Sequence, residues 1–177
     1  MARRMPDCPR EQGEVMLLRV VGIDPGNSGA LALLSDDGGL LAVADMPVLA
    51  DGTKNRVTVN APLLADLIRR WSPANAFCEY VGARPTDAKV AAFAFGRCRG
   101  VIEGTLGAIG VPVAMITVPA WRRAVGLQPG ATKDMARSEA IRRWPAEANL
   151  FARHRDDGRA EACLIGLAGV LRTGKCS

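Results

Sequence analysis

The feature that most constrains the fold is the order of the short apolar segments. Three aliphatic or β-branched runs, 17–23, 29–34 and 40–46, follow one another with turn residues between them. Two more runs, 76–81 and 111–118, each follow a segment of helical spacing. Strands joined by turns form an antiparallel meander, whereas strands that alternate with helices pair in parallel. The order therefore predicts an α/β fold: a mixed five-stranded sheet, with three antiparallel strands and two parallel ones, flanked by helices.

Helix start and stop signals fill the gaps between these strands. Asn60 has the side chain of an N-cap, and Pro73 ends the helix that follows it. Thr132 likewise caps a helix that Pro145 stops. The other expected elements are a long apolar helix over 86–109 capped by Thr86, a helical turn at 119–125, a last helix over 157–172 and a polar loop at 51–56.

Length and composition predict one globular domain. The chain has 177 residues, 49% hydrophobic and 23% charged, which is ordinary for a single soluble domain. We expect a flexible tail over 1–15 and the domain over 16–174, with Met16 as an alternative start. The longest uncharged stretch, 104–121, is interrupted by glycine and proline, and no signal peptide is visible. A cytoplasmic protein without a membrane span is therefore expected.

Cysteine and histidine usage argues against disulfides and zinc. The five cysteines are scattered, no CxxC pair exists, and His154 is the single histidine. We expect reduced thiols, with Cys78 and Cys163 in the core.

The net charge of +5 favours an anionic partner. Arginine supplies 19 of the 23 basic side chains, and its planar guanidinium bonds two phosphate oxygens at once. A basic protein with no nucleic-acid role fits the charge equally well.

Acidic residues occupy positions where the apolar pattern predicts burial. Asp24 directly follows the first strand, and Glu79 lies inside the fourth. Asp157 and Glu161 are four residues apart, so they share a face of the last helix, which is otherwise largely apolar. Carboxylate oxygens suit Mg²⁺ or Mn²⁺. Two such ions can activate a water and stabilise the attacking and leaving oxygens of phosphoryl displacement.

Each acid also has a simpler interpretation. The Asp24 side chain could bond the amides of the following Pro-Gly turn, and Asp157 could be only an N-cap. Glu161 could pair with a nearby arginine such as Arg155. Glu79 is hardest to explain structurally, because a glutamate inside a central strand is unusual.

The segments around these acids resemble RuvC-type Holliday-junction resolvases of the ribonuclease H-like superfamily. The resemblance runs in order through VVGIDPGNSGALAL, CEYV, FGRCRGVIEG, VPAWRRAVG, ATKDMA and DDGRAEACLIG, and it covers about 16–171. GIDPG alone is weak, since sugar kinases and actin-like ATPases carry similar turns, but 177 residues leave no room for their second lobe. The GRAEA variant of the last helix looks more like the phage and prophage branch.

The resemblance implies a four-acid site for two divalent metal ions. Asp24, Glu79 and Glu161 match three of the family's acids. The family's remaining acid or histidine falls at Gly158, so Asp157 is the natural substitute and Asp156 a weaker one. Lys133 matches a family lysine that contacts the cleaved strand.

One family feature is missing from the sequence. The family inserts a bulky apolar wedge from the loop after the fourth-strand acid, where this chain has Gly82, Ala83 and Arg84. The wedge is therefore absent or supplied by Tyr80 or Val81, and the sequence does not predict strict junction selectivity.

The implied activity is that of a crossover junction endodeoxyribonuclease acting on four-way or other branched DNA. Two alternatives remain open: a non-catalytic DNA-binding module of the same fold, and a nuclease for flaps or RNA–DNA hybrids. Apolar residues on more than one face of 86–109 predict a homodimer through that helix, or else burial on all sides within one subunit.

Further candidates flank these motifs. The arginines near Lys133 could follow a DNA backbone or form a solvated basic face. His154 is a weaker candidate for water activation, and the two tryptophans of this region are expected to pack rather than stack on bases. These arginines are Arg122, Arg123, Arg142 and Arg143, and the tryptophans are Trp121 and Trp144.

Overall fold

The computed structural model describes residues 18–52, 56–80, 82 and 88–174. The sheet is mixed, with strand order β3-β2-β1-β6-β7. β1 pairs antiparallel with β2 and parallel with β6, which confirms the predicted architecture. The strands are β1 (Arg19–Asp24), β2 (Ala30–Ser35), β3 (Leu40–Asp45), β6 (Asn75–Glu79) and β7 (Val113–Ile116).

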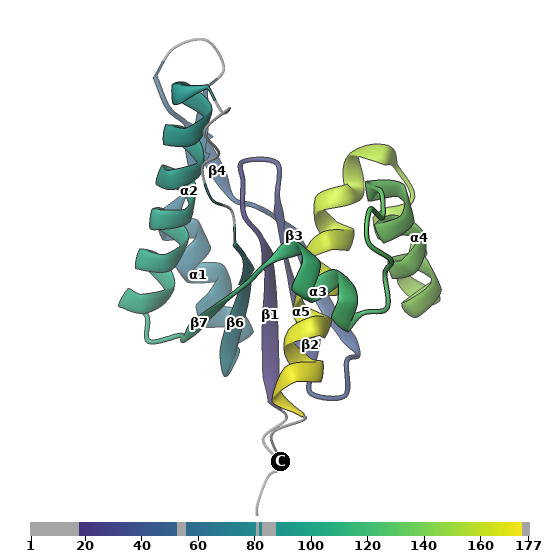
Figure 1. Cartoon of the computed structure of the whole chain (residues 1–177). Coiled ribbons are helices and arrows are strands. Elements are labelled where there is room, and N and C mark those ends of the chain that lie inside the picture. The colour runs from purple at the N-terminus through teal and green to yellow at the C-terminus, as the bar shows by residue number, and fades with distance from the viewer. Residues whose placement is uncertain (1–17, 53–55, 81, 83–87, 175–177) are drawn as a thin grey trace, which may run out of the picture.

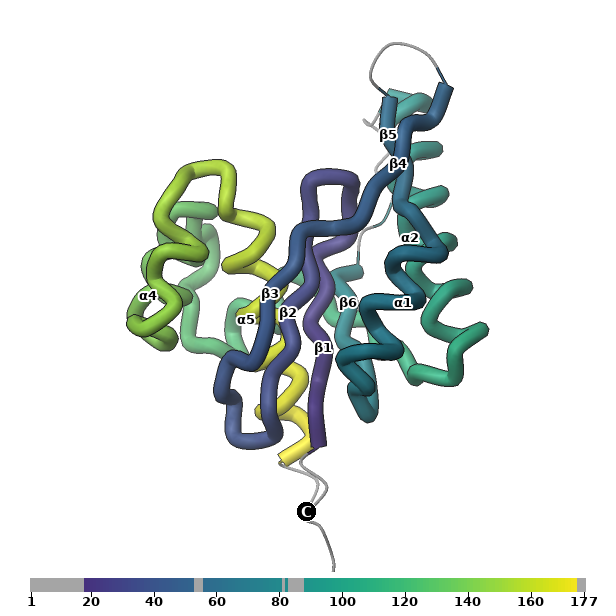
Figure 2. The backbone as a smooth tube through the Cα atoms, turned by 180° about the vertical axis from the view of Figure 1, so that it is seen from behind, coloured from purple at the N-terminus to yellow at the C-terminus, as the bar shows by residue number. Residues whose placement is uncertain are grey.

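Helices cover both faces of the sheet (Figures 1 and 2). α1 and α2 lie on one face, and α3, α4 and α5 on the other. The helices are α1 (Ala61–Trp71), α2 (Lys89–Ala108), α3 (Val118–Ala124), α4 (Lys133–Arg143) and α5 (Asp157–Thr173). Within the described residues, no helix has both the length and the apolarity to span a bilayer.

The side-chain alternation of the strands separates two cores. In β1, Val20 packs on the α5 side, whereas Val21 and Ile23 pack on the α1–α2 side. Cys78 and Cys163 are fully buried, as predicted, one in each core. The central sheet is therefore covered on both faces.

The predicted helix caps are confirmed. The Asn60 side chain accepts a hydrogen bond from the Leu63 amide, and Thr132 accepts one from the Met135 amide, both at 3.2 Å. Thr86, the predicted cap of α2, lies outside the described residues, as does the predicted tail over 1–15.

Two parts of the fold differ from the sequence prediction. On either side of the expected loop at 51–56, two strands that the sequence does not predict, β4 (Val48–Ala50) and β5 (Val57–Val59), pair as a small antiparallel hairpin. Its strands have only three residues each, too few to show a periodicity. The linker before α5 contains two 3₁₀ helices, η1 (Pro145–Phe151) and η2 (His154–Asp156).

The prediction that α2 is buried on all sides is wrong for its first half. Val90 and Phe93 are 73% and 72% exposed, and Phe95 is also exposed. Only the inward face, with Cys98, Ile102 and Leu106, reaches the core. The other sequence-based interpretation, an interface with a second copy, stays a prediction.

A backbone contact between β1 and α5 fixes the helix on the sheet. A Cβ at Gly22 would stand 2.2 Å from the Ala162 carbonyl oxygen and 2.3 Å from the Gly166 nitrogen. Only a residue without a side chain allows this approach. The two main chains therefore touch where β1 crosses α5.

Substitution of Gly22 by alanine tests this contact. We expect Gly22→Ala to lower the free energy of unfolding by about 1–3 kcal/mol, because backbone atoms must shift to admit the methyl group. The measurement is urea denaturation followed by circular dichroism. Gly104→Ala is the matched control, since nothing lies within 4 Å of its Cβ position in α2, and it should stabilise by ~0.5–1 kcal/mol. Equal effects of the two substitutions would contradict the packing argument.

Candidate active site

The sheet brings Asp24 and Glu79 to one edge. Each is the last residue of its strand, and β1 and β6 run parallel, with Ile23 opposite Cys78. Parallel strands end at the same edge of a sheet, where α/β proteins carry their sites. The structure therefore places the first two predicted acids side by side.

α5 brings Asp157 and Glu161 to the same edge. Both lie in its first two turns, four residues apart. The Asp24 carboxylate lies against this turn, because its Oδ2 is 3.0 Å from where a Cβ of Gly158 would stand. Asp24 thus contacts α5, and a side chain at position 158 would crowd both this carboxylate and the Ser28 carbonyl oxygen.

The four carboxylates repel one another. Burial raises the pKa of Asp24 well above its usual range, and the charges of Glu161, Glu79 and Asp157 raise it further. Burial likewise raises the pKa of Glu161, although Lys133 opposes the effect. Asp24 therefore lies near enough to the other three acids for their charges to act on it.

Basic side chains from α3 and α4 partly neutralise these acids. The Lys133 ammonium forms an ion pair and hydrogen bond with Asp157. Although burial alone would raise the pKa of Asp157, this hydrogen bond and charge lower it overall. Arg122 places Nη2 3.6 Å from Glu161 Oε1. The arginine beside Glu161 is therefore Arg122, and the predicted pairing with Arg155 is wrong.

Trp121 is a site residue that sequence reasoning assigned only to packing. Its side chain is fully buried, and its indole Nε1 donates a 2.8 Å hydrogen bond to Glu79 Oε2. Burial raises the pKa of Glu79, and this hydrogen bond opposes the rise. The sequence holds no direct signal for this contact, because 42 residues separate donor and acceptor.

Asp156 lies outside the acidic group. It is buried, and its carboxylate accepts hydrogen bonds from the Arg153 amide and guanidinium at 2.9–3.0 Å. The Arg153 hydrogen bonds lower its pKa to about 2. Asp157 is the first residue of α5 rather than its N-cap. Of the two neighbouring aspartates, only Asp157 faces the site.

The donor chemistry of the four acids fits a hard divalent cation, although they are not arranged as a finished ligand set. No three Asp, Glu, His or Cys side chains among the described residues stand close enough to hold a metal ion. Lys133 and Trp121 now bond two of the four carboxylates. All the donors are oxygens, and their mutual repulsion is a charge imbalance that Mg²⁺ or Mn²⁺ would relieve.

The other predicted residues lie around this group. His154 is 84% exposed and lies 4.0 Å from the Asp134 carboxylate on α4. Arg142 and Arg143 both bond Glu139, whereas Arg123 is exposed. Trp121 and Trp144 pack in the core, as predicted. Of the wedge candidates, Tyr80 is 48% exposed and lies under Arg99, and Val81, Ala83 and Arg84 fall outside the described residues.

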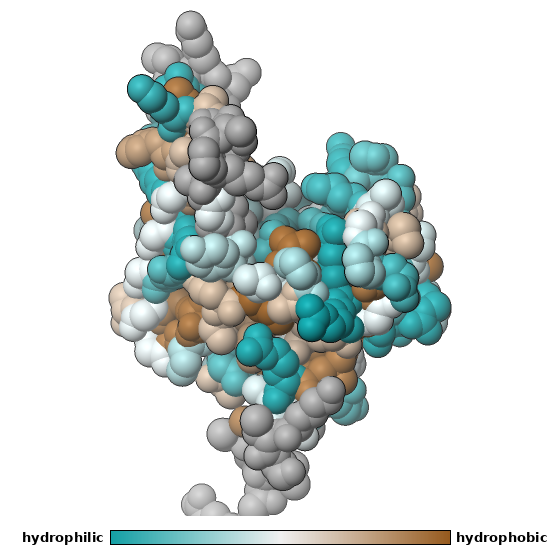
Figure 3. Space-filling view, in the orientation of Figure 1, coloured by the Kyte–Doolittle hydropathy of each residue, from teal (hydrophilic) through white to brown (hydrophobic). Residues whose placement is uncertain are grey.

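Hydrophilic side chains gather beside the lobe formed by α4 and η1 in the space-filling view (Figure 3). The surface is hollowed between this lobe and the column formed by α2. In Figure 1, the carboxyl end of β1 points toward the same region.

Comparison with solved structures identifies the class of fold. The order of strands and the helices on both faces of the sheet match the ribonuclease H-like fold of RuvC. No family model matches the chain, and no curated protein matches its sequence. Two solved structures of RuvC from Thermus thermophilus do match.

Both matches span nearly the whole chain. RuvC in complex with a Holliday junction substrate is 15% identical, with a TM-score of 0.59 over 89% of this chain and 96% of that one. A second RuvC structure is 17% identical, with a TM-score of 0.58 over 90% and 97%. At these identities the likeness establishes a RuvC-like fold.

The hydrogen bond between Trp121 and Glu79 makes a prediction about Glu79. Trp121→Phe keeps the ring but removes the donor to the ionised carboxylate, so we expect the pKa of Glu79 to rise further. Carbon-13 NMR titration of labelled glutamate measures this. Trp144→Phe is the matched control, because its indole donates instead to the Gly38 carbonyl at 3.1 Å. The same Glu79 pKa in both variants would contradict the assignment.

Proposed function

We propose that this protein is a metal-dependent endonuclease that cuts branched DNA, with four-way junctions as its preferred substrate. The observation that carries the proposal is the convergence of Asp24, Glu79, Asp157 and Glu161 at one edge of a RuvC-like sheet. The Thermus RuvC that shares the fold is described in complex with a Holliday junction substrate. The phage or prophage branch remains a prediction from the sequence.

The four acids are the residues that would hold Mg²⁺ or Mn²⁺, two ions per site. Bound ions would supply activation of a water and stabilisation of the leaving oxygen in phosphodiester hydrolysis. Asp24 lies near the other three acids, so it would help each of them to hold the ions. The Trp121 indole, which can only donate a hydrogen bond, would hold the Glu79 carboxylate in a fixed orientation.

Lys133, Arg122 and Arg123 would bind the DNA backbone. Lys133 is 60% exposed at its side chain and already lies against Asp157, so a phosphate next to the acids is within its reach. Arg123 is exposed on α3, next to Arg122. Contacts of this kind position the strand without reading its sequence.

A homodimer through α2 would place two such sites on one junction. Val90, Phe93 and Phe95 expose an apolar surface on the first half of this helix, which is unusual for a free surface helix. A two-fold dimer matches a substrate with two equivalent strands.

Replacement of Asp24 tests the catalytic proposal. We expect the parent protein to nick a synthetic four-way junction in Mg²⁺ or Mn²⁺ and not in EDTA. Asp24→Asn should slow nicking by more than about 100-fold, the upper end of the loss seen when outer-shell partners of a metal are removed. Asp66→Asn, the same change on the exposed face of α1, is the control and should cut like the parent.

A comparison of several DNA substrates distinguishes the proposed resolvase from a hybrid nuclease and from a non-catalytic binding module. Flap, duplex and RNA–DNA hybrid substrates are assayed beside the junction. Cutting of the hybrid alone would replace the resolvase proposal by a hybrid nuclease. Tight junction binding with no cleavage in any cation would favour a non-catalytic binding module.

Introduction of a positive charge on the exposed face of α2 tests the dimer proposal. We expect the parent to sediment as a dimer and Phe93→Arg to weaken association by about 30-fold or more, the loss typical of an interface hot spot. Leu63→Arg is the control, since Leu63 is also exposed, at 53%, but lies on α1. Analytical ultracentrifugation measures both, and a monomeric parent at micromolar concentration would refute the interface.

A further inference from the structure

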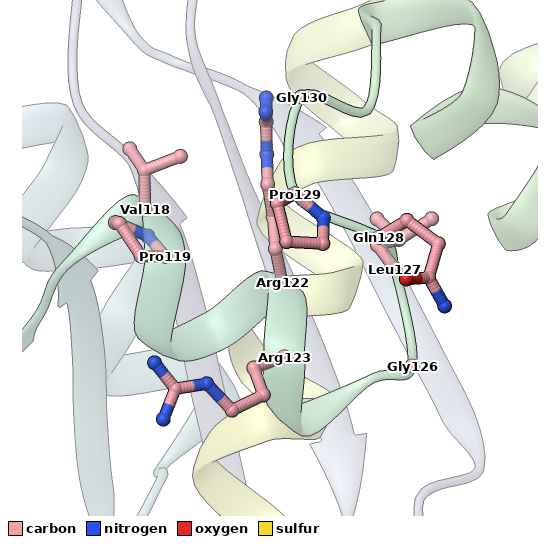
Figure 4. Close-up of a pocket in the computed structure, with 9 residues that line it drawn as sticks. All are labelled: Val118, Pro119, Arg122, Arg123, Gly126, Leu127, Gln128, Pro129 and Gly130. Atoms are coloured by element: carbon pink, nitrogen blue, oxygen red, sulfur yellow. The ribbon is translucent and has the colours of Figure 1, made fainter.

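A pocket of about 370 Å³ opens between α3 and the loop that follows it (Figure 4). Its apolar walls are Val118, Pro119, Leu127 and Pro129. Arg122 rises between Val118 and Pro129, while the side chain of Arg123 leaves α3 in another direction. The volume lies in the range of small-molecule sites, and the combination of apolar walls with guanidinium groups fits an anionic ligand that has a flat apolar part.

The pocket is built in advance by its loop. Gly126 and Gly130 have positive φ values of +82° and +80°, which reverse the chain at both ends of the loop. The Leu127 amide bonds the Arg122 carbonyl at 2.9 Å, and Arg143 bonds the Val125 carbonyl at 2.7 Å. A preformed site loses little entropy when it binds.

Arg122 joins the pocket to the acidic group. Its Nη1 donates to the Ala131 carbonyl at 2.7 Å, and its Nη2 lies 3.6 Å from Glu161 Oε1. Its Nε is buried and makes no hydrogen bond to any described residue. The guanidinium also lies over the Trp121 ring, 5.2 Å from the centroid. One side chain therefore separates the pocket from the carboxylates.

We propose that this pocket receives one unpaired nucleotide of the cleaved strand, next to the phosphate that is cut. The base lies on the apolar walls, and its phosphate faces Arg122. This inference rests on the proposed nuclease function and specifies its substrate: a strand with a base that is already unstacked. Extruding a base from a regular duplex costs free energy, and a branch point lowers that cost.

The first test reads the position of the base directly. 2-Aminopurine is placed in turn at each nucleotide near the branch point of a synthetic junction, and its fluorescence is measured with the full-length protein in EDTA. We expect one position to brighten on binding, because its base leaves the stack. Pro119→Phe narrows the pocket and should remove the brightening. Ala120→Phe, the adjacent exposed position of α3 that does not line the pocket, should retain it.

The second test measures whether the contribution of that base to KM in the cutting reaction depends on the pocket. Removing that base, with an abasic analogue, should raise KM by roughly 5- to 150-fold for the parent and for Ala120→Phe. Pro119→Phe should respond to the same abasic substitution by less than about 2-fold.

The outcomes separate the two proposals. Equal brightening in Pro119→Phe and Ala120→Phe, or no brightening at any position, would overturn the pocket assignment while junction cutting in Mg²⁺ stands. Brightening that depends on Pro119, in a protein that cuts no substrate with any cation, would support the pocket and overturn the nuclease.

Discussion

The contact between the main chains of β1 and α5 is the constraint on which the site depends. With no side chain at Gly22 or Gly166, the helix lies directly on the central strand. Its first two turns then reach the end of β1, and the four-residue spacing of Asp157 and Glu161 turns both toward Asp24. A helix held farther from the sheet would leave Asp24 and Glu79 without these two partners.

The same contact creates an electrostatic problem that the segment after β7 offsets. Burial, together with the charges of the neighbouring carboxylates, raises the pKa values of Asp24 and Glu161. Trp121 and Arg122 on α3 and Lys133 on α4 each direct a donor at a different acid. The three donors lie within thirteen residues of one another, so one segment of chain supplies the positive side of the site.

The sequence predicts the parts of this structure that rest on local patterns. Apolar runs and turn residues are enough for the strand order, and the side chains of Asn60 and Thr132 mark two helix starts. The acids stand out because they interrupt apolar patterns, which is how Asp24 and Glu79 are found. Local signals also place Asp157 and Glu161 on one helical face.

Contacts between distant residues lie beyond such patterns. The hydrogen bond from Trp121 to Glu79 joins side chains 42 residues apart. In the sequence, a tryptophan that donates such a bond cannot be distinguished from one that only packs. The choice between Asp156 and Asp157 depends on the turn of η2, where Arg153 takes Asp156 away from the site. The β4–β5 hairpin is missed because its strands are too short to alternate visibly.

Under the proposed function, the basic residues of the site link DNA binding to metal binding. Lys133 and Arg122 now lie against Asp157 and Glu161, where they compete with any divalent cation. A DNA phosphate that draws these two side chains away leaves the acids without counter-charge, so their affinity for the cation rises. By thermodynamic reciprocity, cation binding frees the same side chains and strengthens DNA binding by the same factor. The site would therefore be complete for cleavage only when both the DNA strand and the divalent cations are bound.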